Sequence, residues 1–150
     1  MDFRLSEEQE MLRAATREFA ESEIAPIAHE IDATETIPDS LRKKLRDNNY
    51  FALLIPQQYG GVGVDAISYA LVMEELSRAS AAVGVTISVH NSVAAGPIAV
   101  FGTKEQKERW LPLLAEKLLG AFALTEPGSG SDSAALTTRA VCGGEAYVLD

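Results

Sequence analysis

Residues Ala121–Asp132 read Ala-Phe-Ala-Leu-Thr-Glu-Pro-Gly-Ser-Gly-Ser-Asp, and the chain changes character at this point. The apolar run Phe122–Thr125 predicts a short strand, and Pro127-Gly128 predicts a turn after it. Glycines allow positive φ angles and a close approach of a ligand to the backbone. Successive N–H groups beside two serine hydroxyls offer hydrogen-bond donors to phosphate oxygens. An ordinary strand and turn would show the same spacing, so spacing alone leaves both interpretations open.

Helical signals dominate the chain before this stretch. Ser6 and Gln9 have the spacing of a capping box, and apolar residues then recur at helical intervals. The sequence therefore predicts a first helix that runs to about Asp32. Pro26 should kink this helix or divide it at Ala25, because proline has no N–H and its ring crowds the preceding turn.

The remaining predicted elements place helices before Gly120 and strands after it. The helices run from Pro38 to about Asn49, from Asp65 to about Arg78, through an uncharged run to about Val93, from Pro97 to Phe101 and from Thr103 to Gly120. The apolar side of the last helix should consist of Trp110, Leu113, Leu114, Leu118 and Leu119. The short apolar run Phe51–Ile55 should be buried. Besides Phe122–Thr125, strands are predicted at Thr137–Val141 and Tyr147–Leu149, with Gly143-Gly144 as the turn between them.

The predicted fold class is mainly α. A helical domain of about six helices should occupy residues 1–120, and the first strands of a β domain should occupy residues 121–150. Three short strands need partners to bury a face. We therefore expect the chain to be the N-terminal portion of a longer protein.

The string Leu124–Asp132, followed by Ser133-Ala134-Ala135, resembles the flavin-binding signature of the acyl-CoA dehydrogenases. Other segments resemble the same family in the same order: Ser6–Gln9, Ile24-Ala25-Pro26, Ile55-Pro56, Tyr59–Gly63 and Phe101–Lys107. The resemblance runs from about residue 3 to the last residue. It implies the N-terminal helical bundle of the acyl-CoA dehydrogenase fold, followed by the start of the middle β domain.

The resemblance also implies a site. The cofactor-binding residues that it assigns are Phe122, Leu124, Thr125, Gly130 and Ser131. The first three match positions along the isoalloxazine ring of FAD, and the last two match positions near its pyrophosphate. Ser131 also matches a position that contacts the acyl-CoA substrate. The catalytic base is expected beyond Asp150, so no catalytic residue is assigned, and we expect these residues alone to be inactive.

The implied activity is the FAD-dependent α,β-dehydrogenation of acyl-CoA thioesters to trans-2-enoyl-CoA, a step of fatty-acid β-oxidation. Electrons would pass to electron-transfer flavoprotein, and the full-length protein is expected to be a homotetramer. Val85–Pro97 resembles the short-chain, butyryl-CoA branch. Two alternatives remain: an acyl-CoA oxidase or flavin monooxygenase of the same fold, and a cofactor-free helical interaction module.

Bulk properties narrow the class of protein. The net charge is −9 without a block of like charges, which argues against a nucleic-acid partner. The single cysteine, Cys142, provides neither a disulfide framework nor a metal-ligand cluster. The N-terminus shows no basic, apolar leader, so we expect no signal peptide. The family resemblance implies a location in the bacterial cytoplasm or the mitochondrial matrix. Ala79–Thr103 lacks charged residues, but its Ser, His, Asn, Gly and Pro residues favour buried helices over membrane insertion.

Three polar features have a structural and a chemical interpretation. His90 lies in the uncharged run, where a lone histidine is more often a hydrogen-bonded core residue than a ligand or base. The position of Glu126 beside the predicted flavin loop suggests a catalytic base. A glutamate before Pro-Gly can equally stabilise the turn by accepting hydrogen bonds from backbone N–H groups. The basic cluster within Arg42–Arg46 is most simply a solvated face, with CoA phosphates as the alternative ligand. The sequence shows no metal-ligand spacing, so no metal site is predicted.

Overall fold

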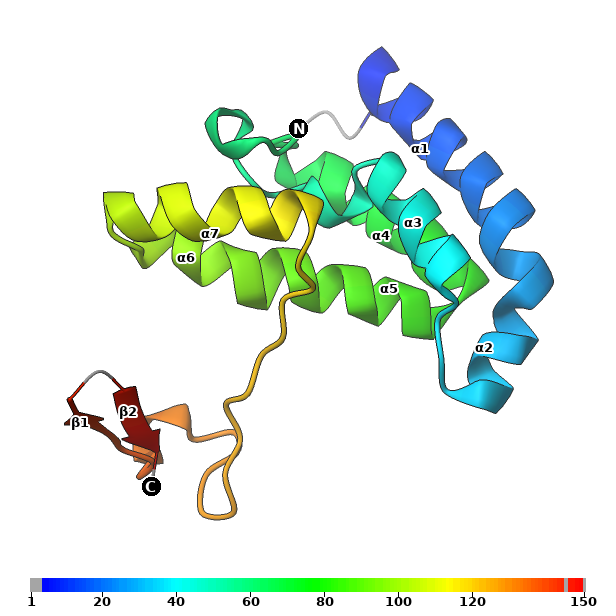
Figure 1. The fold of residues 1–150 in the computed structure, drawn as a ribbon. Coiled ribbons are helices and arrows are strands. Elements are labelled where there is room, and N and C mark those ends of the chain that lie inside the picture. The colour runs from blue at the N-terminus through cyan, green and yellow to red at the C-terminus, as the bar shows by residue number, and fades with distance from the viewer. Residues whose placement is uncertain (1–3, 145, 150) are drawn as a thin grey trace.

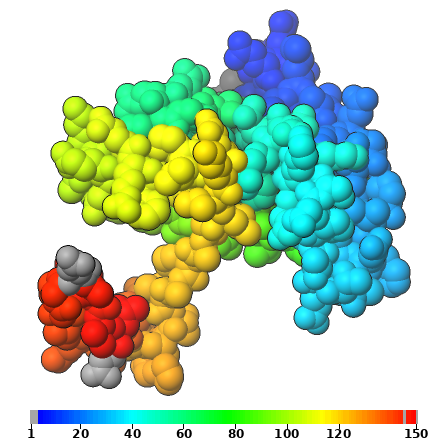
Figure 2. All heavy atoms as spheres, viewed as in Figure 1, coloured from blue at the N-terminus to red at the C-terminus, as the bar shows by residue number. Residues whose placement is uncertain are grey.

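The computed structural model describes residues 4–144 and 146–149. Its helices form one bundle, and a two-stranded hairpin lies apart from the bundle beyond an irregular segment (Figures 1 and 2). The α-helices are α1 (Glu7–Phe19), α2 (Ala28–Thr34), α3 (Asp39–Asp47), α4 (Ala66–Ala79), α5 (Ala81–Ser88), α6 (Gly96–Phe101) and α7 (Lys104–Glu116). Strands β1 (Ala140–Gly143) and β2 (Ala146–Leu149) pair antiparallel, with Val141 opposite Val148. The predicted mainly α fold class is confirmed.

The first predicted helix forms and stays continuous through α2. Its capping box is present: the Ser6 hydroxyl accepts from Gln9 N at 3.2 Å, and Ser6 N donates to Gln9 Oε1 at 3.1 Å. Pro26 is accommodated by a π-helical turn at Ala20–Ile24 and a 3-10 turn at Ala25–Ile27. These turns relieve the missing hydrogen bond and the crowding that proline brings to an α-helix.

The uncharged run forms one long helix rather than two. A π-helical turn, Val89–Ala95, joins α5 to α6, and the chain stays helical from Ala81 to Phe101. In the described part of the chain, this helix alone has the length and composition of a possible membrane span, with a mean hydropathy of 1.3. A core helix of a bundle passes the same test, and here α5 packs on α4 while α6 packs on α7 (Figure 1).

Two groups of buried apolar side chains form the core. The first, between α1, α2, α3, α4 and α5, includes Ile24, Ile31, Leu45, Phe51, Leu76, Val83 and Ile87. The second lies under α7 and consists of Ala52, Ile55, Ala95, Leu111, Leu114 and Ala115. The predicted burial of Phe51–Ile55 is confirmed, because Phe51 and Ile55 are fully covered. Helices α4 and α5 approach closely at Gly84, where an added Cβ would lie 2.1 Å from Ser77 Oγ.

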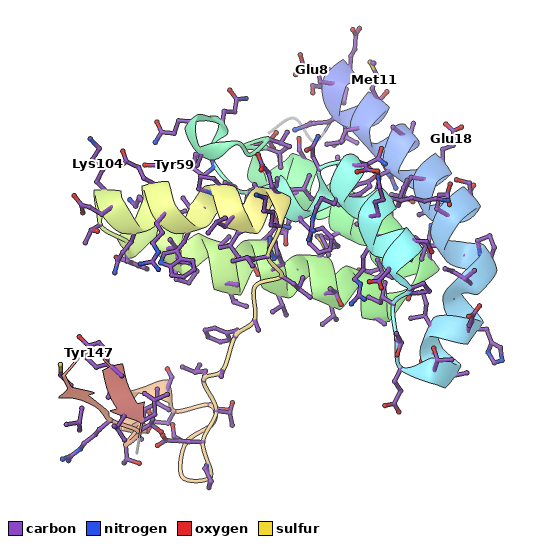
Figure 3. The ribbon with its side chains drawn as sticks, in the orientation of Figure 1. Glu8, Met11, Glu18, Tyr59, Lys104 and Tyr147 are labelled. Atoms are coloured by element: carbon purple, nitrogen blue, oxygen red, sulfur yellow. The ribbon has the colours of Figure 1, made fainter. Side chains whose placement is uncertain are left out.

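One buried carboxylate ties α1 to α4. Glu75 is 1% exposed and accepts from Arg13 Nε at 3.1 Å, Arg17 Nη2 at 2.6 Å and Arg78 Nε at 3.2 Å. The side chains of Arg17 and its neighbours lower the pKa of Glu75 to about 2. On the opposite side of α1, Figure 3 shows Glu8, Met11 and Glu18 pointing away from the bundle into solvent. The sequence pattern of α1 did not reveal the ion pairs that its arginines form with Glu75.

The basic cluster on α3 is a solvated face held by local ion pairs. Arg42 pairs with Asp39, and Lys43 Nζ lies 2.6 Å from Asp47 Oδ2. Lys44 pairs with Glu23 of the preceding π-helical turn. These charges are compensated within the chain, as the simpler interpretation expected.

The prediction for the last helix was wrong at its C-terminal end. Helix α7 stops at Glu116, and Leu118 and Leu119 lie beyond it with exposed fractions of 42% and 50%. The helical pattern already breaks at Leu118, whose N–H donates to Leu113 O at 2.8 Å, five residues back, rather than to Leu114 O. Gly120 N, beyond the end of the helix, donates to the imidazole of His90.

Candidate functional site

The segment that contains the predicted site leaves the bundle at Gly120. Gly120 N donates to His90 Nδ1 at 2.9 Å, and His90 is fully buried. The prediction that His90 is a hydrogen-bonded core residue is confirmed. Its ring also lies edge-on to Phe51, with 5.1 Å between ring centroids.

The predicted strand Phe122–Thr125 does not form. These residues run away from the bundle without a ladder partner, and Phe122 and Leu124 are 49% and 41% exposed. A strand needs a neighbour to satisfy its N–H and C=O groups, and the described residues provide none at this position. The second predicted strand is displaced for a related reason: pairing begins at Ala140 rather than Thr137, whose N–H is already bonded to Glu126.

A tight turn follows at Glu126–Ser129. Glu126 N donates to Ser129 O and Ser129 N donates to Glu126 O, each at 3.0 Å. Ser129 is 5% exposed, and its hydroxyl donates to the carbonyl of Asp132. The turn predicted at Pro127-Gly128 is confirmed. Of the two loop serines, Ser129 is the one whose hydroxyl forms a hydrogen bond within the loop.

Glu126 closes the loop from its other end. Its carboxylate accepts from Thr137 N at 2.6 Å, Thr137 Oγ1 at 2.9 Å and Thr138 N at 2.9 Å, and also from the Thr138 hydroxyl. These donors, the Thr138 hydroxyl foremost, lower the pKa of Glu126 to about 2. The predicted structural role of Glu126 is confirmed, although its backbone partners lie eleven and twelve residues away rather than in its own turn.

The two glycines of the loop are not required by its backbone. Neither Gly128 nor Gly130 has φ in the left-handed region, and an added Cβ at either position would have open space within 4 Å. The expectation of a positive φ was therefore wrong for these glycines. The open space does agree with the other part of the expectation, a surface on which a ligand can approach the backbone closely.

Several hydrogen-bond donors around this surface are unpaired among the described residues. Within residues 4–144 and 146–149, neither the N–H groups of Gly130 and Ser131 nor the hydroxyls of Thr125 and Ser131 form a hydrogen bond. All of these residues are exposed. The structure thus brings the predicted positions from Thr125 to Ser131 together on one loop, with donors suited to an anionic or carbonyl-bearing ligand. Phe122 and Leu124 precede it as exposed apolar side chains.

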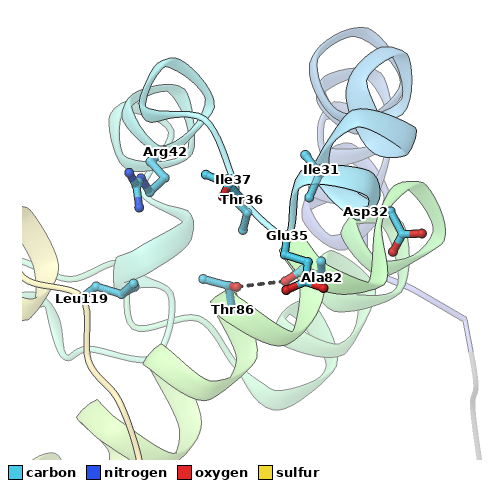
Figure 4. Close-up of a pocket in the computed structure, with 9 residues that line it drawn as sticks. All are labelled: Ile31, Asp32, Glu35, Thr36, Ile37, Arg42, Ala82, Thr86 and Leu119. Carbon is cyan, nitrogen blue, oxygen red and sulfur yellow. Dashed lines mark hydrogen bonds between the residues drawn. The ribbon is translucent and has the colours of Figure 1, made fainter.

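A separate hollow lies between α2, α3 and α5. It has a volume of about 580 Å³ and is lined by residues of α2, α3, α5 and the connecting chain, including Glu35, Arg42 and Leu119 (Figure 4). The Thr86 hydroxyl, at its floor, donates to Ala82 O at 2.9 Å. None of the predicted site residues lines this hollow. Across the described residues, His, Cys, Asp and Glu side chains form no group of three that could hold a metal ion.

Sequence reasoning missed the tertiary partners of the loop. In the sequence, Thr137 and Thr138 are only two adjacent hydroxyl residues, and nothing marks them as partners of Glu126. The hydrogen bond between His90 and Gly120 joins positions thirty residues apart. Such pairs depend on how the elements pack.

Known proteins are similar to this chain over nearly its whole length. The chain is 44% identical over 151 residues to the short-chain-specific acyl-CoA dehydrogenase of Clostridium acetobutylicum, an alignment that covers 100% of this chain and 40% of that protein. A solved structure described as the electron-transferring flavoprotein of Acidaminococcus fermentans is similar with a TM-score of 0.91 and 41% identity, over 99% of this chain and 40% of that one. An acyl-CoA dehydrogenase of Bacillus anthracis, solved with FAD, is similar with a TM-score of 0.82 and 37% identity, over 97% of this chain and 25% of that one.

The chain spans 39–40% of the length of curated relatives that it matches. Residues 6–117 match the family model described as "Acyl-CoA dehydrogenase, N-terminal domain". This match covers the helices α1 to α7, and the segment Ala121–Asp132 begins four residues after its end. The chain belongs to the acyl-CoA dehydrogenase family and contains the N-terminal domain of that family.

Proposed function

We propose that the protein catalyses the FAD-dependent α,β-dehydrogenation of short-chain acyl-CoA thioesters and that Phe122, Leu124, Thr125, Gly130 and Ser131 form part of its flavin site. The observation that carries the proposal is the set of unpartnered donors beside Gly130, around which the described residues leave open space. An ordinary turn would have no need for a small residue at Gly130, because neither its backbone angles nor the packing of the described residues requires one.

The residues fit the chemical groups of FAD. The N–H groups of Gly130 and Ser131 can donate to the pyrophosphate, and the absence of a Cβ at Gly130 permits close approach. The Thr125 hydroxyl can bond to the polar edge of the flavin, while Phe122 and Leu124 can cover its apolar face. The Ser131 hydroxyl can also contact the acyl-CoA thioester. When bound, FAD would supply the acceptor for the hydride that leaves the substrate.

Glu126 is not a candidate for the base in this scheme. Its carboxylate is engaged by four donors, and its pKa of about 2 leaves it without affinity for a proton near neutral pH. The base is expected from the family resemblance to lie beyond Asp150.

Similarities to known proteins support the finer parts of the proposal. One similar structure contains FAD, one relative is specific for short-chain substrates, and one similar structure is described as an electron-transferring flavoprotein. We therefore infer a short acyl chain and an electron-transfer flavoprotein as the electron acceptor. A homotetramer and a location in the bacterial cytoplasm or mitochondrial matrix remain predictions from the family resemblance, as does the division of the chain at residue 120.

The test uses the protein expressed from the complete reading frame that contains these residues. Its visible spectrum is recorded, and butyryl-CoA is then added in the absence of oxygen. Bleaching of the oxidised-flavin absorbance is expected, and re-oxidation should require electron-transfer flavoprotein. Rapid re-oxidation by oxygen alone would favour an acyl-CoA oxidase or monooxygenase, whereas a colourless protein that FAD does not reconstitute would leave a cofactor-free helical module.

A matched pair of glycine variants tests the site itself. Gly130→Val and Gly128→Val each add a side chain where the chain leaves open space, so both variants should fold. We expect Gly130→Val to lose FAD, because its side chain would occupy the space given to the pyrophosphate. Gly128→Val, at the turn, should retain it. Equal retention of FAD by the two variants would contradict the assignment of Gly130.

A further inference from the structure

The point at which the candidate flavin segment leaves the bundle is held by one side chain. His90 Nδ1 accepts the Gly120 N–H at 2.9 Å, and the residue after Gly120 begins the segment Ala121–Asp132. An imidazole nitrogen can accept a hydrogen bond only when it carries no proton, so this contact requires neutral His90. The contact therefore depends on both the position and the protonation state of His90.

Gly120 is also confined sterically. An added Cβ would lie 2.5 Å from Ala94 Cβ, 3.3 Å from Leu114 Cδ2 and 3.4 Å from His90 Nδ1. Real Cβ atoms do not occupy such space without a shift of their neighbours, so the backbone of Gly120 sits against α7 and the long helix. The hydrogen bond sets the orientation of a residue that packing already holds in place.

The π-helical turn Val89–Ala95 provides the anchor for this contact. Next to His90, Asn91 is fully buried and bonds to a different part of the chain: Asn91 Oδ1 accepts from Leu54 N at 3.1 Å, and Asn91 Nδ2 donates to Tyr50 O at 2.9 Å. Adjacent residues thus fasten the same turn to two separate segments. Single π-helical turns inside longer helices occur frequently at functional sites.

A small change at Gly120 would be amplified at the site. Thr125 lies five residues further along the chain, which can span at most about 17 Å. A rotation of about 10° at Gly120 could then move Thr125 by up to about 3 Å, a distance comparable to a hydrogen bond. Binding by Thr125 and the following loop is therefore sensitive to the geometry at Gly120.

We propose that His90 is a positioning residue for the flavin site, which acts by accepting the Gly120 N–H and so fixing the direction in which Ala121–Asp132 leaves the bundle. The proposal rests on the proposed function, since it concerns the same loop. His90 acts through the backbone of Gly120.

The surroundings of His90 favour its neutral form. Burial has the largest effect and lowers its pKa, hydrogen bonding with the backbone of Leu114 and Phe51 raises it, and the positive charge of Arg46 on α3 lowers it again. The Phe51 ring lies edge-on to the imidazole, and Lys117, just after α7, bonds through its carbonyl to Arg46 Nη1 at 3.3 Å. Protonation at low pH would remove the acceptor for Gly120. Flavin affinity should therefore fall at pH values below the ordinary histidine pKa of about 6.5.

The experiment measures the dissociation constant of FAD for the full-length protein and two variants between pH 8 and pH 5. His90→Leu removes the acceptor, whereas His90→Asn keeps a side-chain oxygen near the position of Nδ1. We expect His90→Leu to bind FAD about tenfold more weakly at pH 8, the factor that corresponds to one neutral hydrogen bond. His90→Asn should bind within about twofold of the wild type, and its affinity should not follow the wild-type loss at low pH.

A purely structural role would lower stability without this pattern. If folded His90→Leu binds FAD as tightly as the wild type, or if both variants lose affinity equally, the proposal is wrong. If His90→Leu does not fold, the pH profile of His90→Asn decides, and a profile identical to the wild type contradicts the proposal. A wild-type protein that binds no FAD at any pH refutes the proposed function itself, an outcome distinct from the other three.

Discussion

Replacing Glu75 by glutamine tests how α1 is held on the bundle. Glu75 is 1% exposed, and three arginines surround its carboxylate, at distances of 2.6 Å from Arg17 Nη2, 3.1 Å from Arg13 Nε and 3.2 Å from Arg78 Nε. Glutamine keeps the shape of the side chain but removes its negative charge. The three guanidinium groups would then face one another with their closest counter-charge removed.

The expected loss of stability follows from the pKa of Glu75. Its decrease from an ordinary value of 4.5 to about 2 corresponds to roughly 3 kcal/mol at about 1.4 kcal/mol per pKa unit. The arginine side chains are 37–49% exposed, so water screens part of this interaction. We therefore expect Glu75→Gln to lower the free energy of unfolding by about 1–2 kcal/mol near neutral pH.

Urea unfolding followed by circular dichroism measures this change. Glu74→Gln is the matched control, because Glu74 is 60% exposed and its one ion pair, with Arg13, is long at 3.7 Å. This substitution should change the free energy of unfolding by no more than about 0.5 kcal/mol. The pKa of Glu75 is lowered in the folded state, so its contribution is complete above the unfolded pKa of about 4.3 and decreases as the pH falls towards 2. A Glu75→Gln variant as stable as Glu74→Gln at pH 7, or a difference unchanged at pH 3, would refute this reasoning.

The remaining predictions concern close packing and a buried amide. Gly84→Val should destabilise the protein by about 1–3 kcal/mol, because its Cβ would meet Ser77 Oγ at 2.1 Å; an unchanged urea midpoint would show that α4 and α5 can separate freely. Gly96→Ala is the control, since its nearest contact would be 3.6 Å away, and it should be neutral or more stable by up to about 1 kcal/mol. Asn91→Ala should lower the free energy of unfolding by about 2–4 kcal/mol, because the part-buried N–H of Leu54 and the carbonyl of Tyr50 each lose this partner. A loss below about 1 kcal/mol in the same assay would mean that these groups find other partners.

The hairpin illustrates a feature that the sequence predicted in type but not in place. Local signals predicted a turn at Gly143-Gly144 and a strand at Tyr147–Leu149. In the structure Gly143 ends β1, Gly144 turns with φ of 81°, and the second strand runs from Ala146 to Leu149. Strand β1 begins at Ala140 because Thr137 and Thr138 bond to Glu126 instead of a neighbouring strand. Competition between two sets of partners for the same N–H groups cannot be resolved from the sequence of either set.

The sequence by itself determined the helices and the family resemblance. Capping boxes such as Ser6 with Gln9 act within one turn, so the residues that decide them are adjacent in the chain. Only the tertiary structure decided how Gly120 is held on the bundle and how the loop is closed. The bond from Gly120 to His90 and the bonds from Thr137 to Glu126 join residues that are distant in sequence. Their formation depends on packing of the whole chain, which brings donor and acceptor within about 3 Å.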